Sequence, residues 1–153
     1  MLLSEMLTPD VIIPEMKATD RWSCIGELVD CVVNAGKLPV AERKTVYDLL
    51  VNREMLMTTG IGHGIAIPHA SYDGTKTMVA AFGRSPHGIS FEALDGKPVH
   101  YITLLVVPKL QFQTHLRTLS VLAKFYNDPA RRTQIDQAAT AQDLANCFQV
   151  PID

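Results

Sequence analysis

Apolar residues recur every three to four positions in the segment 20–36, which is the period of one face of an α-helix. Thr19 or Asp20 can cap the start of this helix, and Gly36 can end it in a left-handed conformation. A second helix is expected over residues 39–53, because a proline at its start is favoured in a first helical turn. The first third of the chain is therefore predicted to be mainly helical.

Continuous apolar runs predict buried strands in the middle of the chain. Residues 78–82 and 99–107 are the two clearest, and the second is apolar enough to lie centrally in a sheet covered on both faces. Residues 65–67 predict a short buried strand that stops at the following proline. The segment 84–98 contains two glycines and two prolines, so we expect a loop there, with a short edge strand at residues 89–91.

The last third of the chain returns to a helical pattern. A helix is expected from about Thr114, followed by a short helical turn after Asp128 and a last helix capped by Thr140. At 153 residues the chain fits one domain, over residues 1–153. The order of the elements predicts an α/β fold, with a mixed sheet and helices on both of its faces.

Composition excludes several classes of partner. With 14 basic and 16 acidic residues the formal net charge is -2, which gives no electrostatic footprint for nucleic acid or for an anionic membrane. No apolar run approaches the ~20 residues that span a bilayer, and the first residues lack the basic segment of a secretory signal. The three cysteines show no CxxC spacing, which favours a reducing compartment, the cytoplasm.

The most specific segment of the chain combines glycines with a histidine. Residues 58–64 hold three glycines in five positions and show no helical period, which predicts a loop with unusual backbone angles. His69 follows the short strand and its terminal Pro68, so its imidazole should stand on a rigid rim. Neutral imidazole is a good nucleophile near pH 7, because its ordinary pKa is about 6.5. His69 is therefore a candidate phosphoryl acceptor.

A phosphoryl group adds about -1.5 to -2 charges, which donors must meet. Backbone N–H groups of the glycine segment can form an anion-binding nest, and Arg53 offers a planar fork that suits phosphate oxygens. If Thr114 is the N-cap of its helix, His115 lies in the first turn, where the helix dipole favours an anion. Arg53 and His115 are therefore candidate partners of His69.

Each of these features alone has an ordinary structural interpretation, as a turn, a solvated helix end or an exposed histidine, and only their combination indicates a site. Zinc binding is the competing use of five histidines, but the sequence has no HExxH, no CxxC and no helical histidine pair, so no metal is predicted. A serine or cysteine hydrolase is also disfavoured, because no GxSxG occurs. His87 and His100 are expected to be structural.

The stretch that begins at Glu54 and continues through residues 61–70 resembles the phosphorylation-site signature of a known family. That family is the enzyme IIA domains of the fructose/mannitol type from the bacterial phosphotransferase system. The similarity extends to Asn52–Arg53 upstream and to Thr114–Leu116 downstream. The resemblance implies an α/β fold with a mixed sheet of about five strands, and a site that needs neither a metal nor a cofactor.

The resemblance also implies roles for particular residues. His69 would accept a phosphoryl group from an HPr-type phosphocarrier protein, with Arg53 and His115 lining the site. The implied phosphate-binding residues are Thr59, Gly60, Gly62, His63 and Gly64. A carrier must supply the other half of the site, so we expect an apolar docking rim, for which the candidates are Ile61, Ile65 and Phe112.

Among the relatives, the glycine segment is most similar to that of the free-standing nitrogen-regulatory IIA proteins. For that type the family implies regulatory targets such as a potassium transporter or a sensor kinase. Two departures leave a second interpretation open: His63 stands where asparagine is expected, and Ala70–Ser71 stand where Gly-Lys is frequent. The alternative is a free-standing sugar-specific IIA protein that passes phosphate from His69 to an enzyme IIB.

Overall fold

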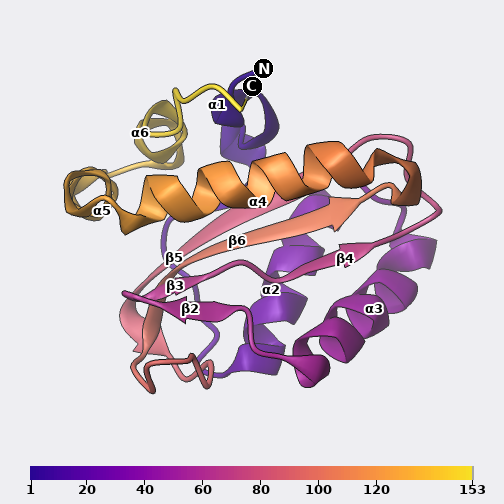
Figure 1. Cartoon of the computed structure of the whole chain (residues 1–153), viewed down its shortest axis with the longest axis horizontal. Helices are drawn as coiled ribbons and strands as arrows, with labels where there is room; N and C mark the ends of the chain where they lie inside the picture. The colour runs from indigo at the N-terminus through magenta and orange to yellow at the C-terminus, as the bar shows by residue number, and fades with distance from the viewer. Residues whose placement is uncertain (153) are drawn as a thin grey trace.

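One mixed β-sheet runs through the molecule, with helices on both of its faces (Figure 1). The computed structural model describes residues 1–152, without the side chains of Phe112 and Thr114. The strands are β1 (Ile12–Ile13), β2 (Gly60–Gly62), β3 (Ile65–Ala66), β4 (His69–Ser71), β5 (Val79–Ile89) and β6 (Val99–Val107). Their order is β1-β5-β6-β3-β2, and β4 also pairs with β6. The predicted mixed α/β fold is confirmed.

The strands β3 and β4 follow one another along the same edge of β6. Both run parallel to β6, with Ile65 opposite Tyr101 in β3 and His69 opposite Leu105 in β4. Pro68 separates the two, because it has no N–H for the ladder. Six strands therefore occupy five positions in the sheet, in line with the expected number of about five.

The hairpin of β5 and β6 differs from the prediction in one of its strands. β6 matches the predicted central strand 99–107, whereas β5 continues to Ile89 instead of ending at residue 82. Regular pairing lapses between Arg84 and Ile89, around Pro86, and resumes where Ile89 lies opposite Val99. The predicted edge strand at 89–91 is thus wrong, because a bulge accommodates the proline within β5.

Two long helices cover one face of the sheet: α2 (Arg21–Asn34) and α3 (Arg43–Leu56). The carboxylate of Asp20 accepts the N–H of Ser23 at 2.9 Å and so caps α2, and Gly36 has a φ of 77° after its end, as predicted. A short 3₁₀ turn (Val40–Glu42) precedes α3, which continues three residues beyond Arg53. Arg53 therefore lies in the last turn of α3 and not at its end.

The other helices lie on the opposite face: α1 (Leu3–Met6), α4 (Phe112–Asn127), α5 (Pro129–Gln137) and α6 (Ala141–Asn146). The N-cap of α4 is Gln111, so the helix begins two residues before Thr114 and the predicted cap is wrong. A 3₁₀ turn (Lys109–Gln111) leads directly into α4, which explains the early start. Thr140 caps α6 as predicted, by accepting the N–H of Asp143 at 3.1 Å.

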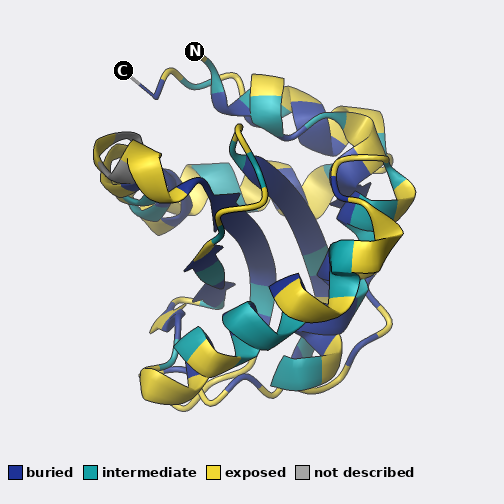
Figure 2. Ribbon diagram, turned by 90° about the vertical axis from the view of Figure 1, so that its right-hand side faces the viewer, coloured by how far each residue is buried: buried dark blue, intermediate teal, exposed yellow. Residues whose placement is uncertain are grey.

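The central strand β6 carries a hydrophobic core on each face (Figure 2). Ile102, Leu104 and Val106 pack in the core beneath α2 and α3. Tyr101, Leu105 and Val107 pack in the core beneath α4, α5 and α6. This alternation is the two-residue period of a strand buried on both faces. Within the described residues, no helix combines the length and apolar character needed to cross a bilayer, and the three cysteines are free.

Candidate functional site

His69 is the first residue of β4, and its imidazole is half-buried. Its Nδ1 lies 2.7 Å from the carbonyl oxygen of Ile67. A carbonyl oxygen can only accept, so Nδ1 carries the ring proton and Nε2 keeps a free lone pair. Of the two ring nitrogens, Nε2 is therefore the one that can act as a nucleophile.

The break between β3 and β4 makes this hydrogen bond available. The N–H of Ile67 donates to Thr59 at 3.1 Å, and the carbonyl oxygen of Pro68 accepts the N–H of Leu105 at 3.0 Å. The carbonyl of Ile67 lies between these two bonds and outside the named strands, where it accepts from the His69 ring. The backbone conformation before Pro68 thus points the Ile67 carbonyl at the His69 ring and sets its tautomer.

His115 packs against His69, as predicted. The two ring centroids are 5.3 Å apart, with the rings tilted by 53°, and His115 is only 8% exposed. His115 is the fourth residue of α4, because the helix begins at Phe112. A backbone N–H at that position is already used within the helix, so His115 can contact an anion through its imidazole only.

Arg53 completes the group from the last turn of α3. Its Nη1 donates to the carbonyl oxygen of Met57 at 3.0 Å, which uses one of its five N–H donors. The positive charge of Arg53 is among the causes that lower the pKa of both His69 and His115. The guanidinium group therefore acts electrostatically on both rings, and the three predicted residues come together.

Burial is the main reason why both imidazoles stay neutral. The pKa of His69 is below its ordinary value of 6.5, because burial and then the charge of Arg53 outweigh the bond to Ile67, which raises it. The pKa of His115 is lowered by burial first, and then by the charges of His69 and Arg53. A neutral ring is the form that can attack phosphorus, so His69 is ready to react at neutral pH.

We expect the reactivity of His69 to be highest in neutral and alkaline solution and to fall to half its maximum at a pH below 6.5. The sign follows from the lowered pKa, because the ring is protonated only after the pH has dropped below the ordinary midpoint. An NMR titration of the His69 ring, together with transfer rates at each pH, measures this. A titration midpoint above 6.5 would contradict the expectation.

Thr59 and Gly60 lie close to His69, but their donors are occupied. The N–H and the hydroxyl of Thr59 both donate to the buried carboxylate of Glu54, at 2.9 and 2.7 Å. The N–H of Gly60 donates to the hydroxyl of Thr58 at 3.1 Å. The predicted role of Thr59 and Gly60 as phosphate donors is therefore not supported, since each would first have to give up a bond within the protein.

Gly62, His63 and Gly64 lie at the turn of the β2–β3 hairpin, away from His69. Residues 58–64 are only partly a loop: Gly60–Gly62 form β2, which pairs with β3, and the chain turns at His63 and Gly64, where the predicted unusual backbone angles occur as positive φ values. This turn lies near Tyr101, whereas His69 lies opposite Leu105, a separation of about 13 Å at 3.3 Å per residue. The N–H of His63 donates to Asp95 at 3.3 Å. This register does not support the prediction that Gly62, His63 and Gly64 cradle a phosphate on His69.

The predicted docking rim is also partly wrong. Ile61 is 43% exposed and can contact a partner, but Ile65 is 1% exposed and belongs to the core beneath α4. Phe112 begins α4, and its side chain lies outside the described residues. Burial of Ile65 follows from its place in β3, which lies next to the central strand.

Sequence reasoning missed three exposed apolar residues beside Arg53. Met55, Leu56 and Met57 are 68%, 84% and 65% exposed, and Leu116, next to His115, is 48% exposed. Clustered exposed apolar side chains of this kind commonly mark a protein interaction surface. The signal in the sequence was an apolar triplet at a helix end, where the amphipathic pattern calls for polar residues. We name Met55–Met57 the apolar rim.

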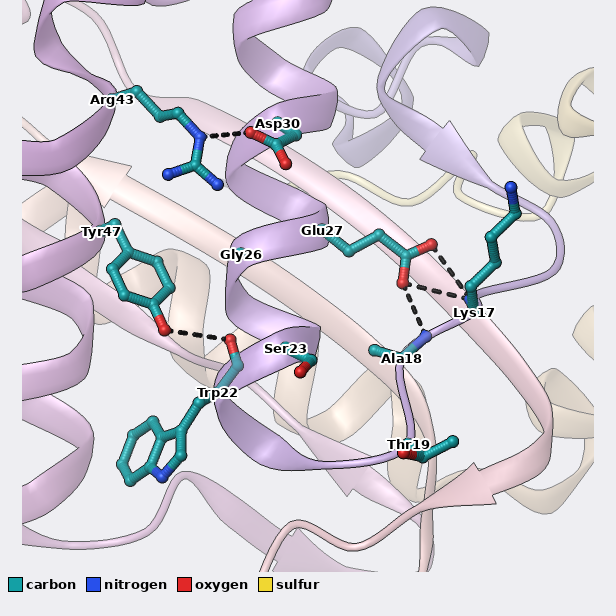
Figure 3. Close-up of a pocket in the computed structure, with 10 residues that line it drawn as sticks. All are labelled: Lys17, Ala18, Thr19, Trp22, Ser23, Gly26, Glu27, Asp30, Arg43 and Tyr47. Carbon is teal, nitrogen blue, oxygen red and sulfur yellow. Dashed lines mark hydrogen bonds and ion pairs between the residues drawn. The ribbon is translucent and has the colours of Figure 1, made fainter.

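The molecule also has a groove of about 750 Å³ between α2 and α3 (Figure 3). Three of its charged groups have partners within the protein: Arg43 pairs with Asp30, and Glu27 accepts the backbone N–H groups of Lys17 and Ala18. Its lining includes no histidine. Among the described residues, no cluster of His, Cys, Asp or Glu is arranged to hold a metal. His69, His115 and Arg53 remain the candidate site.

A nucleophilic imidazole beside a second imidazole and a guanidinium group, on a mixed α/β sheet, suits a phosphoryl-accepting protein. The family model described as "Phosphoenolpyruvate-dependent sugar phosphotransferase system, EIIA 2" matches residues 5–150. The chain belongs to this family.

Relatives of two types are similar to the chain. The nitrogen regulatory protein of Pseudomonas aeruginosa is 30% identical over 99% of this chain and 95% of its own length. The fructose-specific EIIABC component of Bacillus subtilis is 35% identical over 90% of this chain, which spans only 21% of that longer protein. The crystal structure of nitrogen regulatory protein IIA-Ntr from Neisseria meningitidis has a TM-score of 0.87 at 29% identity, covering 95% of this chain and 98% of the other. The chain is thus a IIA protein of the phosphotransferase system, homologous to the nitrogen-regulatory type.

Proposed function

We propose that Nε2 of His69 accepts a phosphoryl group from an HPr-type phosphocarrier protein in the cytoplasm, and that the phosphorylation state of the chain regulates its partners. The observation that carries this proposal is the hydrogen bond from Nδ1 of His69 to the carbonyl of Ile67, which leaves Nε2 free to react. The expected carrier and regulatory partners follow from membership of the family.

The transfer needs no separate base. The Nε2 lone pair attacks phosphorus, the bond from phosphorus to the donor nitrogen breaks, and the donor ring takes the electron pair. The proton on Nδ1 of His69 stays in place, so the phosphorylated ring is cationic and keeps its bond to Ile67. Catalysis is therefore a matter of orientation and of charge already in position.

Arg53 and His115 are the groups that meet the charge of the phosphate. One N–H of the Arg53 guanidinium group donates to the carbonyl oxygen of Met57, and the other N–H groups can donate to a phosphate. Two of them together can bind two phosphate oxygens at once. His115 is neutral and lies against His69, so it can donate to a phosphoryl oxygen without repelling the attacking ring. We assign both residues to stabilising the transferred group.

The apolar rim is the proposed docking surface for the carrier. It is adjacent in sequence to Arg53, and Leu116, which follows His115 on α4, is a further exposed apolar residue. A docked carrier would exclude water from the two reacting rings and strengthen the electrostatic contacts of Arg53. Ile65 takes no part, because it lies in the core.

The regulatory type is the better supported of the two. The similarity to the nitrogen regulatory relative covers nearly the whole of both proteins, and the fold match to IIA-Ntr is close. The alternative is a sugar-specific IIA protein that hands the phosphate to a cysteine of an enzyme IIB, and it is favoured by the 35% identity to the fructose-specific component.

One experiment tests the function and separates the two types. The purified chain is incubated with phosphorylated carrier, and phosphate that is labile to acid and stable to base is measured on it. A IIB protein and sugar are then added. Phosphate that stays on the chain supports regulation, whereas rapid loss to sugar supports the uptake role. A chain that takes up no phosphate contradicts both.

A further inference from the structure

We propose that Glu54 is a positioning residue for His69 and that it acts through a chain of hydrogen bonds ending at Nδ1 of the ring. The inference deepens the proposed function and rests on it, because the ring that Glu54 positions is the phosphoryl acceptor. Glu54 is buried in the last turn of α3, directly after Arg53, and nothing above gives it a chemical role.

The first link is a clamp, the pair of hydrogen bonds from Thr59 to Glu54, whose Oε1 also accepts the hydroxyl of Thr58 at 3.4 Å. Oε1 of Glu54 accepts the N–H of Thr59 at 2.9 Å, and Oε2 accepts the hydroxyl of the same threonine at 2.7 Å. Glu54 is 1% exposed and Thr59 is 4% exposed. Buried bonds to a carboxylate are stronger than neutral ones, so the clamp fixes both the backbone and the side chain of Thr59.

The second and third links lead from Thr59 to the ring. The carbonyl oxygen of Thr59 accepts the N–H of Ile67 at 3.1 Å. The carbonyl oxygen of Ile67 in turn accepts the Nδ1 proton of His69 at 2.7 Å. Ile67 lies where the pairing with β6 is interrupted, so Thr59 supplies support that the sheet does not give at this point. The direction of the Ile67 carbonyl thus depends on the Glu54 clamp.

Glu54 acts by geometry rather than by its charge on the ring. Its charge does contribute to raising the pKa of Cys24, after burial and the charge of Glu27, so the carboxylate acts on the core beneath α2. The charge that acts on the pKa of His69 is that of Arg53. Loss of the clamp should therefore change the tautomer of His69 more than its titration.

The tautomer matters because the reaction needs the lone pair on Nε2. In water a neutral histidine side chain favours the form with the proton on Nε2, which cannot attack through that atom. The Ile67 carbonyl reverses this preference, as hydrogen-bond partners of a histidine commonly do. Any change that lets this carbonyl turn away reduces the reactive fraction of the ring.

The test is Glu54→Gln, which keeps the shape but leaves one acceptor oxygen and places an NH₂ group against the donors of Thr59. The ¹⁵N chemical shifts of the two His69 ring nitrogens report the tautomer in the full chain without any donor. We expect the fraction with the proton on Nε2 to rise, and transfer from phosphorylated carrier to slow by on the order of tenfold.

Glu27→Gln is the matched control. Glu27 on α2 also holds backbone, by accepting the N–H groups of Lys17 and Ala18 at 2.9 to 3.1 Å (Figure 3), and no hydrogen bond links it to Thr59, Ile67 or His69 among the described residues. Because these bonds are more exposed than those of Glu54, Glu27→Gln should lower the unfolding temperature by less, and it should leave both the tautomer and the rate unchanged. If Glu54→Gln behaves in the same way as Glu27→Gln, its role is structural and the proposal is overturned.

If Glu54→Gln does not fold, a second pair of variants, at Thr59, tests the same proposal. Thr59→Val removes only the hydroxyl link, whereas Thr59→Ser retains it, so the first should shift the tautomer and the second should not. Equal spectra for these two variants would overturn the proposal. The tautomer is measured on the chain without phosphate. A chain that takes up no phosphate but shows these changes in tautomer would contradict the proposed function and would leave the positioning role of Glu54 intact.

Discussion

Replacing His69 by asparagine will abolish phosphate uptake from the phosphorylated carrier and leave the fold intact. The asparagine amide N–H can take the place of Nδ1–H and donate to the Ile67 carbonyl, while the nucleophilic Nε2 is removed. The expected loss is complete, because no other atom at this position can form the phosphoramidate. Acid-labile, base-stable phosphate on the chain is the measurement, with the unfolding temperature as the check on the fold.

Phosphorylation of the neighbouring His115 is the outcome that would contradict this prediction. His115 lies 5.3 Å from His69 between ring centroids, so it is the nearest alternative acceptor known from the described residues. Phosphate on the His69→Asn chain at the level of the unchanged protein would show that another side chain is the acceptor. The mechanism above would then have to be abandoned.

Arg53→Ala should slow phosphoryl transfer by about 10- to 100-fold. Hydrogen bonds to charged groups contribute roughly 1.5 to 3 kcal/mol, and each 1.4 kcal/mol is a factor of about ten in rate. The pKa of His69 should also rise, because the charge of Arg53 is one of the causes that lower it. Single-turnover rates and an NMR titration of the ring measure the two effects.

Arg53→Lys separates charge from geometry. Lysine keeps the positive charge but loses the planar fork, so we expect a rate between those of Arg53→Ala and the unchanged chain. The fold should survive both changes, since the hydrogen bond that Arg53 makes within the described residues, to the carbonyl of Met57, is exposed to solvent. An unchanged transfer rate in Arg53→Ala would remove this residue from the mechanism.

The parts of the fold that were predictable from the sequence have a strong local cause. The helix α2 begins at a side-chain cap, Asp20, and a glycine with positive φ, Gly36, follows its end. The strand β6 is apolar at nearly every position because helices cover both of its faces. His69 could be proposed as the acceptor from the sequence because a proline sets the strand end just before it, and because the surrounding motif resembles that of a known family.

The errors share a different cause, which is pairing between distant segments. The glycine segment was predicted to be a loop because glycine has no side chain to show the two-residue period of a strand. Only the register against β6 reveals that the turn at His63 and Gly64 lies away from His69. In the same way, the cover of α4 over β3, which buries Ile65, is a tertiary contact that local sequence does not encode.

The hydrogen-bond acceptor for the His69 ring belongs to the main chain. Because every residue type has a carbonyl, no substitution at position 67 deletes the group that holds the proton on Nδ1. Mutational drift at that position can alter packing without removing the reactive form of the ring. The vulnerability of this site to mutation therefore lies in the residues that support the backbone, and a search for inactivating variants should begin with them.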